Sequence, residues 1–519
     1  MNLAYSNSWV YKFKKISCIF IAGYTTTSSF AQDIPNEITF LNLANQFHIT
    51  PSFSTTETWT SNLYSNTGNK VSGRVTEVSP GINAIKSTGR IKGYLNYSLN
   101  ILNYSGGDGR DSINNSLNSS INSEIIEGHG FVDATGLITQ QTISAFALQT
   151  NNNNYNKNKT EISTYGISPY YRGNLSNIFD YEVRYSLATM RAKNNDNFSS
   201  NDRTAIVSLN GNEIFKKLSW GINARSQFVS RKNSPDTEVD KLNISLNYLI
   251  SDKLVISVSS GREVQNYITT EKESSRTSGI GLNWSISEMT KLSANAENNP
   301  LGKMHSVNFA HRTPRTSWSV SDVKSVSLSN SKITPSLGSN YDLLFSQFSS
   351  IEPDPIKRSQ LVNNYLQLNG ISPNSTAING YLTAGTSLQH AQNITFALLG
   401  VRDTVTFTAA RSIGKKIGLV TIAASDDLNN SSSIRQDGYT ISYTHRLTAD
   451  TVLNNQFSNQ KIYGELYSQN SELKSVNLSA STRIGSKAFF TMSARHSISS
   501  SPSSAYKETA VIGNLTLQF

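Results

Sequence analysis

The chain has 519 residues, of which 37% are hydrophobic, and its mean hydropathy is −0.36. Ser, Asn and Thr alternate with Leu, Ile, Val, Tyr and Phe along most of it, which argues against the apolar cores of a soluble multidomain protein and favours a transmembrane β-barrel with a lipid face and a wet lumen. The net charge of +10 is dispersed without a Lys/Arg block, which argues against nucleic acid as a partner and favours outer-membrane lipid and anionic lipopolysaccharide.

The first 31 residues predict a secretory signal peptide. A basic segment with three lysines precedes an apolar run at 16–24, and the small-x-small triplet 29–31 offers a cleavage site. The apolar run is too short to cross a membrane as a helix. The one cysteine, Cys18, lies in this segment, so the mature protein is expected to lack disulfides, thiolate metal sites and cysteine nucleophiles. Residues 32–46 are expected to form a periplasmic lead, and 47–519 the barrel.

From residue 47 onward the chain repeats a unit of strand, short turn, strand and longer polar loop. The alternation is clearest at Leu242, Ile244 and Leu246, which are separated by polar residues, and it recurs at 181–187 and 476–480. Period two is the strand period, and in a barrel it turns apolar side chains outward and polar ones inward. A soluble β-sandwich would show the same alternation, so this pattern leaves both folds open.

The connections alternate between short and long, and this favours the barrel. Outer-membrane barrels have short periplasmic turns and long extracellular loops, whereas sandwich loops have no reason to alternate in length. About eleven long loops predict an all-β protein, a large antiparallel transmembrane barrel of about 22 strands, with a range of 18–24 and both termini in the periplasm. The short connections are 216–217, 251–252, 313–316, 448–450 and 485–487, and the long ones include 151–159, 193–203, 231–240, 269–276 and 425–437.

One segment, 331–379, departs from the strand pattern. Its apolar residues from Tyr341 to Phe348 recur at intervals of three and four, which is the helix period. Asp354 then stands as an N-cap before a proline, and Gly370 lies where a helix would stop. A barrel this wide cannot fill its lumen with wall side chains. The helical insertion is therefore a candidate plug or cap, with a loop packed on the rim as the alternative.

The last strand, 506–519, resembles the closing strand of a bacterial outer-membrane barrel, which the barrel-assembly machinery recognises. Alternate residues of this strand are apolar, and the chain ends on an aromatic residue with no tail. We assign Leu515, Leu517 and Phe519 to this membrane-assembly signal. The usual form has Gly five residues before the final aromatic, whereas Gly513 lies one position earlier.

The insertion and the strands after it resemble a family of outer-membrane proteins encoded with the PEP-CTERM/exosortase protein-sorting and exopolysaccharide system. The likeness is sharpest over a Leu-Phe pair, a Pro-Asp-Pro triplet, residues at helical spacing and a Gly-x-Arg-x-Thr-Val-Thr strand, in which Asp403 stands where the family has Asn. These elements are Leu344-Phe345, Pro353-Asp354-Pro355, Arg358, Val362, Leu366, Gly370, Gly400, Arg402, Thr404, Val405 and Thr406. Similar motifs occur at 131–134, 313–316, 436–438 and 445–448.

The resemblance implies a non-enzymatic outer-membrane channel or scaffold that serves exopolysaccharide export or PEP-CTERM protein sorting. It also implies components of those systems as partners, and it brings no cofactor and no established catalytic residue. The candidate plug or lumen residues are Asp354, Arg358, Arg402, Asp403 and Arg411. Two alternatives stay open: a general diffusion porin or solute channel, and a surface adhesin or embedded hydrolase.

The residues themselves offer no catalytic or metal motif. None of the seven histidines forms an H-E-x-x-H helix, there is no G-x-S-x-G elbow, and the glycine pair at 279 and 281 has no following helix. His305 and His311 share a strand face at most, and we interpret them as polar groups of the lumen or of an interface.

Arginines and tyrosines in the strands leave alternatives. Five arginines alternate with apolar residues and are predicted to point inward, which would give either an electropositive lumen or ion pairs with neighbouring carboxylates. They are Arg184, Arg225, Arg262, Arg411 and Arg495. Tyrosines such as Tyr170, Tyr171 and Tyr248 indicate either an aromatic girdle at the membrane interfaces or a sugar-stacking track in the lumen.

Overall fold

The computed structural model describes residues 47–519 apart from several stretches of the connections. The stretches outside the description are 66–67, 69, 88, 107–110, 151–155, 177, 212–216, 233, 270, 329–340, 342–343, 346–347, 349–357, 360–361, 363–376, 419–425 and 503–504. The predicted signal peptide and periplasmic lead, 1–46, also lie outside the described residues. Among the residues described, no helix combines the length and the apolarity that crossing a bilayer requires.

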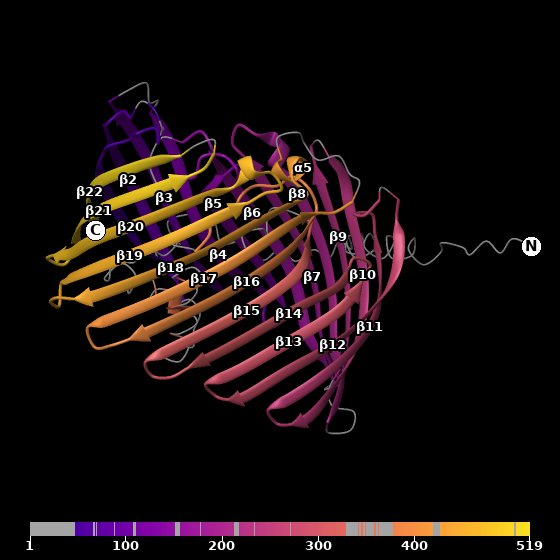
Figure 1. The fold of residues 1–519 in the computed structure, drawn as a ribbon. Coiled ribbons are helices and arrows are strands. Elements are labelled where there is room, and N and C mark those ends of the chain that lie inside the picture. The colour runs from indigo at the N-terminus through magenta and orange to yellow at the C-terminus, as the bar shows by residue number, and fades with distance from the viewer. Residues whose placement is uncertain are drawn as a thin grey trace, which may run out of the picture. The chain divides into compact units, whose positions relative to one another are not determined.

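The described chain forms one antiparallel sheet of 22 strands (Figure 1). The strands are β1 (His48–Thr60), β2 (Gly73–Lys86), β3 (Ile91–Ser105), β4 (Ser112–Ile126), β5 (Gly130–Thr142), β6 (Lys159–Leu175), β7 (Phe179–Ala192), β8 (Ser200–Gly211), β9 (Leu218–Arg231), β10 (Ser234–Ser251), β11 (Leu254–Gln265), β12 (Glu273–Ser287), β13 (Thr290–Asn299), β14 (Gly302–Arg312), β15 (Thr316–Ser327), β16 (Ser387–Leu399), β17 (Asp403–Lys416), β18 (Ser433–Arg446), β19 (Thr451–Tyr463), β20 (Ser471–Ile484), β21 (Ala488–Ser500) and β22 (Tyr506–Gln518). Short helical elements are η1 (Asp196–Phe198), α5 (Asp427–Asn430) and η4 (Tyr467–Gln469).

The sheet closes on itself because the last strand pairs with the first. Each strand pairs with its successor, and β22 pairs antiparallel with β1 from Thr60 opposite Ala510 to Ser52 opposite Gln518. Closure satisfies the backbone groups of both edges, which a membrane demands. The predicted all-β antiparallel barrel of about 22 strands is confirmed, and the amide of Phe519 completes the seam by donating to the carbonyl of Pro51 at 3.0 Å.

The connections at the two ends differ, although less regularly than predicted. The end that joins odd strands to the following even strands carries the longer loops, including 143–158, 328–386 and 417–432. The predicted long loop at 231–240 is wrong: β9 runs to Arg231 and β10 begins at Ser234. Polar residues there continue the strands beyond the apolar belt instead of forming a loop, so polarity alone did not mark the strand end.

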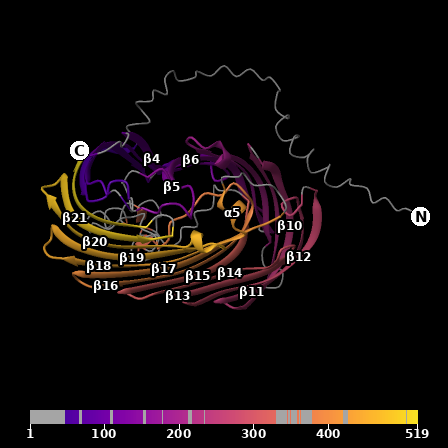
Figure 2. The ribbon, with the colours of Figure 1, turned by 45° about the horizontal axis from the view of Figure 1, so that its top comes forward.

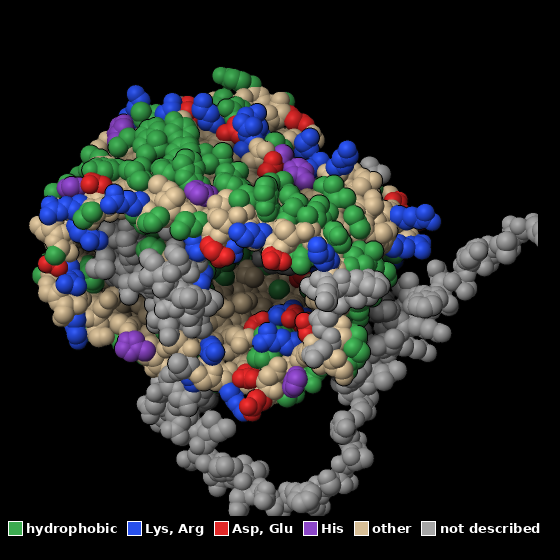
Figure 3. Space-filling model, turned by 90° about the horizontal axis from the view of Figure 1, so that it is seen from below, with side chains coloured by type: hydrophobic (Ala, Val, Ile, Leu, Met, Phe, Trp, Pro, Cys, Tyr) green, Lys and Arg blue, Asp and Glu red, His purple; other side chains and the backbone are tan. Residues whose placement is uncertain are grey.

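The outer face carries an apolar belt, and Figure 3 shows a continuous hydrophobic area on one side of the molecule. On β10 the outward residues Leu242, Ile244 and Leu246 are each nearly half exposed, although they are apolar. Near the short turns the rings of Tyr171 and Tyr181 stack with centroids 6.1 Å apart, and Phe179 lies 6.1 Å from Trp220. Such a belt with an aromatic girdle is the surface that a transmembrane barrel presents to lipid.

Replacing Leu246 by arginine is expected to destabilise the barrel by about 2–4 kcal/mol, the cost of a cation at the middle of the lipid face. Leu246 is the central member of the outward apolar run on β10 and is 46% exposed. The free energy of unfolding in urea, measured in lipid vesicles, tests this. The matched control is Asn247→Arg, which faces the lumen and is expected to change the unfolding free energy by less than about 1 kcal/mol. Equal losses for both variants would contradict the assigned lipid face.

Candidate functional site

Three chain segments fold together inside the long-loop mouth, and we call them the crossbar: 143–150, 377–386 and 426–432. The first follows β5, the second precedes β16 and the third lies between β17 and β18. Figure 2 shows α5, which belongs to the third segment, within the ring of strands. The segments come from nearly opposite walls, since β17 is the twelfth strand after β5 in a ring of 22. The crossbar therefore spans the lumen.

Two adjacent buried carboxylates tie the three segments together. Asp426, which is fully buried, accepts hydrogen bonds from the Thr383 hydroxyl at 2.8 Å and from the backbone amide of Ala384. Asp427 accepts from the Ser144 hydroxyl at 2.8 Å and from the Ala145 amide at 2.6 Å. Hydrogen bonds between buried groups stabilise the contacts that they join. The N-cap residue of α5 and the first residue of α5 thus hold segments from two different walls.

An apolar cluster supports the carboxylates. Leu382 and Leu428 of the crossbar are almost fully buried against inward side chains of the wall. These wall residues are Ile162 of β6, Met190 and Ala192 of β7, Ile434 of β18 and Ile462 of β19. Since β18 comes eleven strands after β7, the cluster joins walls half a circumference apart. A packed apolar core at this point excludes water from one sector of the mouth.

The second segment lies directly on the inner wall. Gln436 of β18 donates from Nε2 to the carbonyl of Asn379 at 2.9 Å, and the amide of Asn379 donates to Gln460 at 3.2 Å. Gly438 of β18 lies directly against this segment, because a Cβ at this position would collide with the carbonyl of Ala377. Only glycine allows the segment to approach this closely. The motif at 436–438 noted in the sequence is therefore the place where the crossbar contacts β18.

Burial perturbs both crossbar carboxyls. It raises the pKa of Asp426 above its usual value, against hydrogen bonds from Ala384, Leu428 and Thr383 that lower it. Burial also raises the pKa of Asp427, and the neighbouring Asp426 adds to this. Burial also raises the pKa of the Tyr381 hydroxyl, and the charges of Asp426 and Asp427 add to this. The crossbar thus holds ionisable groups whose protonated forms fit it better than their charged forms do.

Raising the pH is expected to loosen the crossbar. The two carboxyls have raised pKa values in the closed crossbar, so their contribution is complete below the ordinary carboxyl pKa and is lost as the pH rises through the raised values. Hydrogen exchange at the Leu382 and Ala384 amides, corrected for intrinsic base catalysis, measures the opening. Asparagine at both aspartate positions is expected to flatten this dependence. A wild-type opening equilibrium that does not change with pH would contradict the assignment.

The lumen also contains a cavity of about 660 Å³, lined by both polar and apolar side chains of the wall from β8 to β16. Its charged side chains are three acids, Asp202, Glu263 and Glu297, and two bases, Arg225 and Lys241, so it has no excess of positive charge. Lys241 pairs with Glu297, and Arg225 donates to Gln227 at 2.6 Å, which in turn donates to Asp202 at 2.6 Å. A cavity of this kind suits a polar, uncharged solute better than a strongly anionic one.

The five strand arginines divide between the two faces. Arg184, Arg225 and Arg495 point inward as predicted, and Arg184 binds Asp133 at 2.6 Å while Arg495 binds Glu508 at 2.9 Å. The inward prediction is wrong for Arg262 and Arg411. Arg262 pairs in register with the outward Leu242, and Arg411 binds the outward Asp437 at 2.7 Å. The inward arginines are therefore neutralised partners and do not create an electropositive lumen.

Tyr170 lies in the lumen, while Tyr171 and Tyr248 belong to the outer face. Arg184 lies over the Tyr170 ring at 3.8 Å, and Phe131 stacks on that ring with centroids 5.1 Å apart. The two partners come from β7 and β5, on either side of β6, so both faces of Tyr170 are covered. Tyr170 consequently stiffens the wall and offers no open ring for a sugar.

The candidate plug residues do not meet at one place. Arg402 lies in the short turn before β17, and Asp403 at the start of that strand is exposed and accepts hydrogen bonds from Tyr443 and His445 at 2.7 Å. Arg411 lies on the outer face, as above. Asp403 and Arg411 therefore lie on the outward face and do not line the lumen, while Arg402 lies in a turn at the rim of the barrel. Asp354 lies outside the described residues.

The described part of the predicted insertion has the helical packing that the spacing indicates. Tyr341, Leu344 and Phe345 are helical, and Leu344 is fully buried in a small cluster with Phe348 and Val362. The hydroxyl of Tyr341 donates to Ser359 at 2.8 Å. Arg358 lies over the Phe345 ring at 4.8 Å, so this candidate residue packs within the insertion.

Comparison with known proteins gives no family. No family model matches the chain, and no curated protein matches its sequence. Among solved structures the chain is similar to the FrpB iron transporter from Neisseria meningitidis (10% identity, 91% of this chain, 81% of that chain, TM-score 0.47). It is also similar to the siderophore receptor PirA from Acinetobacter baumannii (8%, 91%, 80%, 0.47) and to a BenF-like porin from Pseudomonas fluorescens Pf-5 (6%, 91%, 99%, 0.37). The closed 22-stranded barrel itself is established by the strand pairing of this chain.

Proposed function

We propose that this chain is an outer-membrane channel for a polar solute or polymer, with the long-loop mouth narrowed by the crossbar. The observation that carries the proposal is the crossbar itself, held by Asp426 and Asp427 between opposite walls. A barrel of 22 strands encloses more space than wall side chains fill. A packed element across its mouth is consistent with control over what passes.

The finer role that we propose is the export of exopolysaccharide or the sorting of PEP-CTERM proteins. The sequence resemblance motivates it, and the cavity in the lumen, whose lining has no excess of positive charge, favours an uncharged carbohydrate over an anionic polymer as the cargo. The general diffusion porin remains the second candidate, since a crossbar that closes only one sector of the mouth would leave an open path beside it. Bilayer conductance separates the two: a closed baseline that opens when 331–379 is deleted supports an exporter, whereas steady open conductance supports a porin.

The cargo needs a separate test in a host that makes both products. Deleting the gene is expected to reduce secreted polysaccharide or surface-displayed PEP-CTERM proteins, and the intact gene should restore them. Unchanged amounts of both would overturn the finer role and leave the channel proposal standing, since conductance tests that independently.

A further inference from the structure

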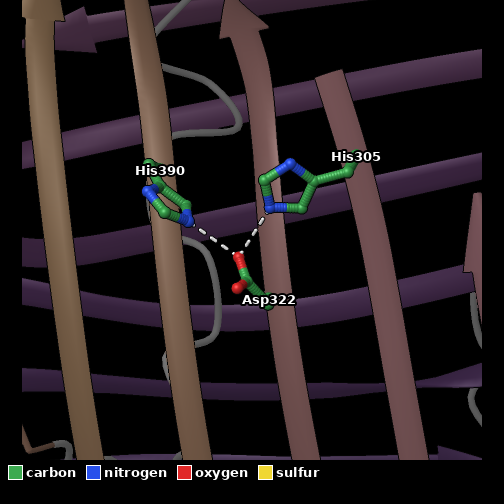
Figure 4. Close-up of side chains that lie close together, drawn as sticks. All are labelled: His305, Asp322 and His390. Carbon is green, nitrogen blue, oxygen red and sulfur yellow. Dashed lines mark hydrogen bonds and ion pairs between the residues drawn. The ribbon is translucent and has the colours of Figure 1, made fainter. Parts of the chain in front are cut away.

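Three side chains on the outer wall converge at one point: His305 of β14, Asp322 of β15 and His390 of β16 (Figure 4). Asp322 Oδ1 lies 2.9 Å from His305 Nε2 and 2.7 Å from His390 Nε2. The three candidate ligand atoms all lie within 4.8 Å of one another. We propose that these residues form a binding site for a divalent transition metal, with Zn²⁺ as the best fit.

The ligand set has the chemistry of such a site. Two imidazole nitrogens and one carboxylate oxygen are ligands that Zn²⁺ takes in open sites, where three protein ligands leave a fourth position for water or an outside oxygen. Each neutral imidazole can carry its proton on Nδ1 and present the Nε2 lone pair. The side chains are 29–35% exposed, so an ion can reach them and the fourth position is open.

Strand pairing positions the three side chains close together in the absence of an ion. β14, β15 and β16 are consecutive hydrogen-bonded strands, and His305 and His390 both lie opposite Lys324 in the register. Asp322, two residues before Lys324, reaches diagonally between the two rings. Gln392 donates from Nε2 to the other carboxylate oxygen, Oδ2, at 3.0 Å. A second hydrogen bond of this kind fixes the orientation of a ligating carboxylate.

The site lies on the outward face, between the apolar belt and the long-loop end. Outward neighbours towards the short turns are apolar, among them Trp318 and Ile394. β15 and β16 are the strands between which the 328–386 segment leaves and re-enters the wall. A bound ion would therefore clamp the two attachment strands of the insertion. Lys324 opposes a cation here, so Lys324→Gln is expected to tighten metal binding.

Titration of the metal-free, full-length protein in detergent with Zn²⁺ tests the site. The wild type is expected to bind one ion tightly, His305→Ala/His390→Ala to lose at least about 100-fold in affinity, and Asp322→Asn about 10- to 100-fold. The control is His445→Ala, which breaks a similar outward His–Asp pair with a single histidine and should leave the affinity unchanged. Co²⁺ in place of Zn²⁺ should give the absorption of a tetrahedral site only where both histidines are present.

Equal Zn²⁺ affinity and stoichiometry in the wild type and the double variant would overturn the proposal, because the triad would then be a hydrogen-bonded cluster only. Heat-dependent migration on gels reports whether each variant is folded. If the double variant does not fold, His390→Gln alone must weaken the affinity, and unchanged binding in that variant overturns the proposal equally.

Discussion

Replacing Asp426 and Asp427 together by alanine is expected to release the crossbar and raise the open fraction of the channel about 100-fold. The carboxylates receive five hydrogen bonds, from Thr383, Ala384 and Leu428 on one and from Ser144 and Ala145 on the other. Each such bond contributes about 0.5–1.5 kcal/mol. Because burial of the carboxylates offsets part of this, we take a net loss of about 3 kcal/mol, which is a factor of about 100.

Two measurements check this result. Exchange of the Leu382 and Ala384 amides reports release of the crossbar, and planar-bilayer conductance reports passage through the mouth. The control is Asp196→Ala, an exposed carboxylate at the same end whose ion pair with Lys232 is open to solvent. Such pairs contribute about 0–1 kcal/mol. Faster exchange without a rise in conductance would show that the crossbar does not limit passage.

A glycine substitution dislodges the crossbar without changing any charge. Gly438→Ala places a methyl group against the Ala377 carbonyl, whereas Gly513→Ala has no atom within 4 Å of the added Cβ. The first variant is expected to shift exchange and conductance in the same direction as the double alanine variant. The second should leave both unchanged.

Replacing Glu508 by alanine is expected to destabilise the barrel by about 3–5 kcal/mol, because it leaves a buried guanidinium without its carboxylate. Arg495 and Glu508 are 5% and 1% exposed and are 2.9 Å apart. The Thr60 hydroxyl also donates to Glu508 at 2.8 Å, so this carboxylate joins β21, β22 and β1 at the seam of the barrel. Equilibrium unfolding in lipid vesicles measures the loss.

The matched control is Glu127→Ala. Its ion pair with Arg90 has a similar distance of 3.0 Å, but the two side chains are 84% and 63% exposed, so a loss of only about 0–1 kcal/mol is expected. Replacing the buried ion pair by an apolar pair, Arg495→Met/Glu508→Leu, should recover most of the stability. A loss of less than about 1 kcal/mol in Glu508→Ala would show that the pair is not buried in the membrane-embedded barrel.

The sequence predicted the barrel because each strand carries its own evidence. Leu242, Ile244 and Leu246 reveal the strand period locally, and pairing with the next strand needs only a hairpin. The face of a strand residue is harder to predict near the rims. Arg262 and Arg411 continue outward rows beyond the apolar belt, where the outward face is polar too, so the rule of apolar out and polar in no longer applied to them.

The crossbar and the His305–Asp322–His390 site were not predictable in the same way. Ser144 and Asp427 are 283 positions apart, and only closure of the barrel brings them together. The adjacent pair Asp426-Asp427 in a serine-rich loop was the one local signal, as an N-cap before a short helical turn. His305 and His390 come from strands separated by β15 and the insertion, and no spacing along the chain connects them.

The β1–β22 seam has a consequence for how the barrel forms. Thr60 and Glu508 are 448 positions apart, and joining chain segments that distant costs about 5 kcal/mol of loop-closure entropy. Until 510–518 are in place, the sheet has two unpaired edges, and such edges are templates for pairing with other chains. The last strand therefore protects the whole sheet from aggregation. A chain cut before Tyr506 keeps all the remaining hairpins, but it should accumulate as open sheets that associate with one another.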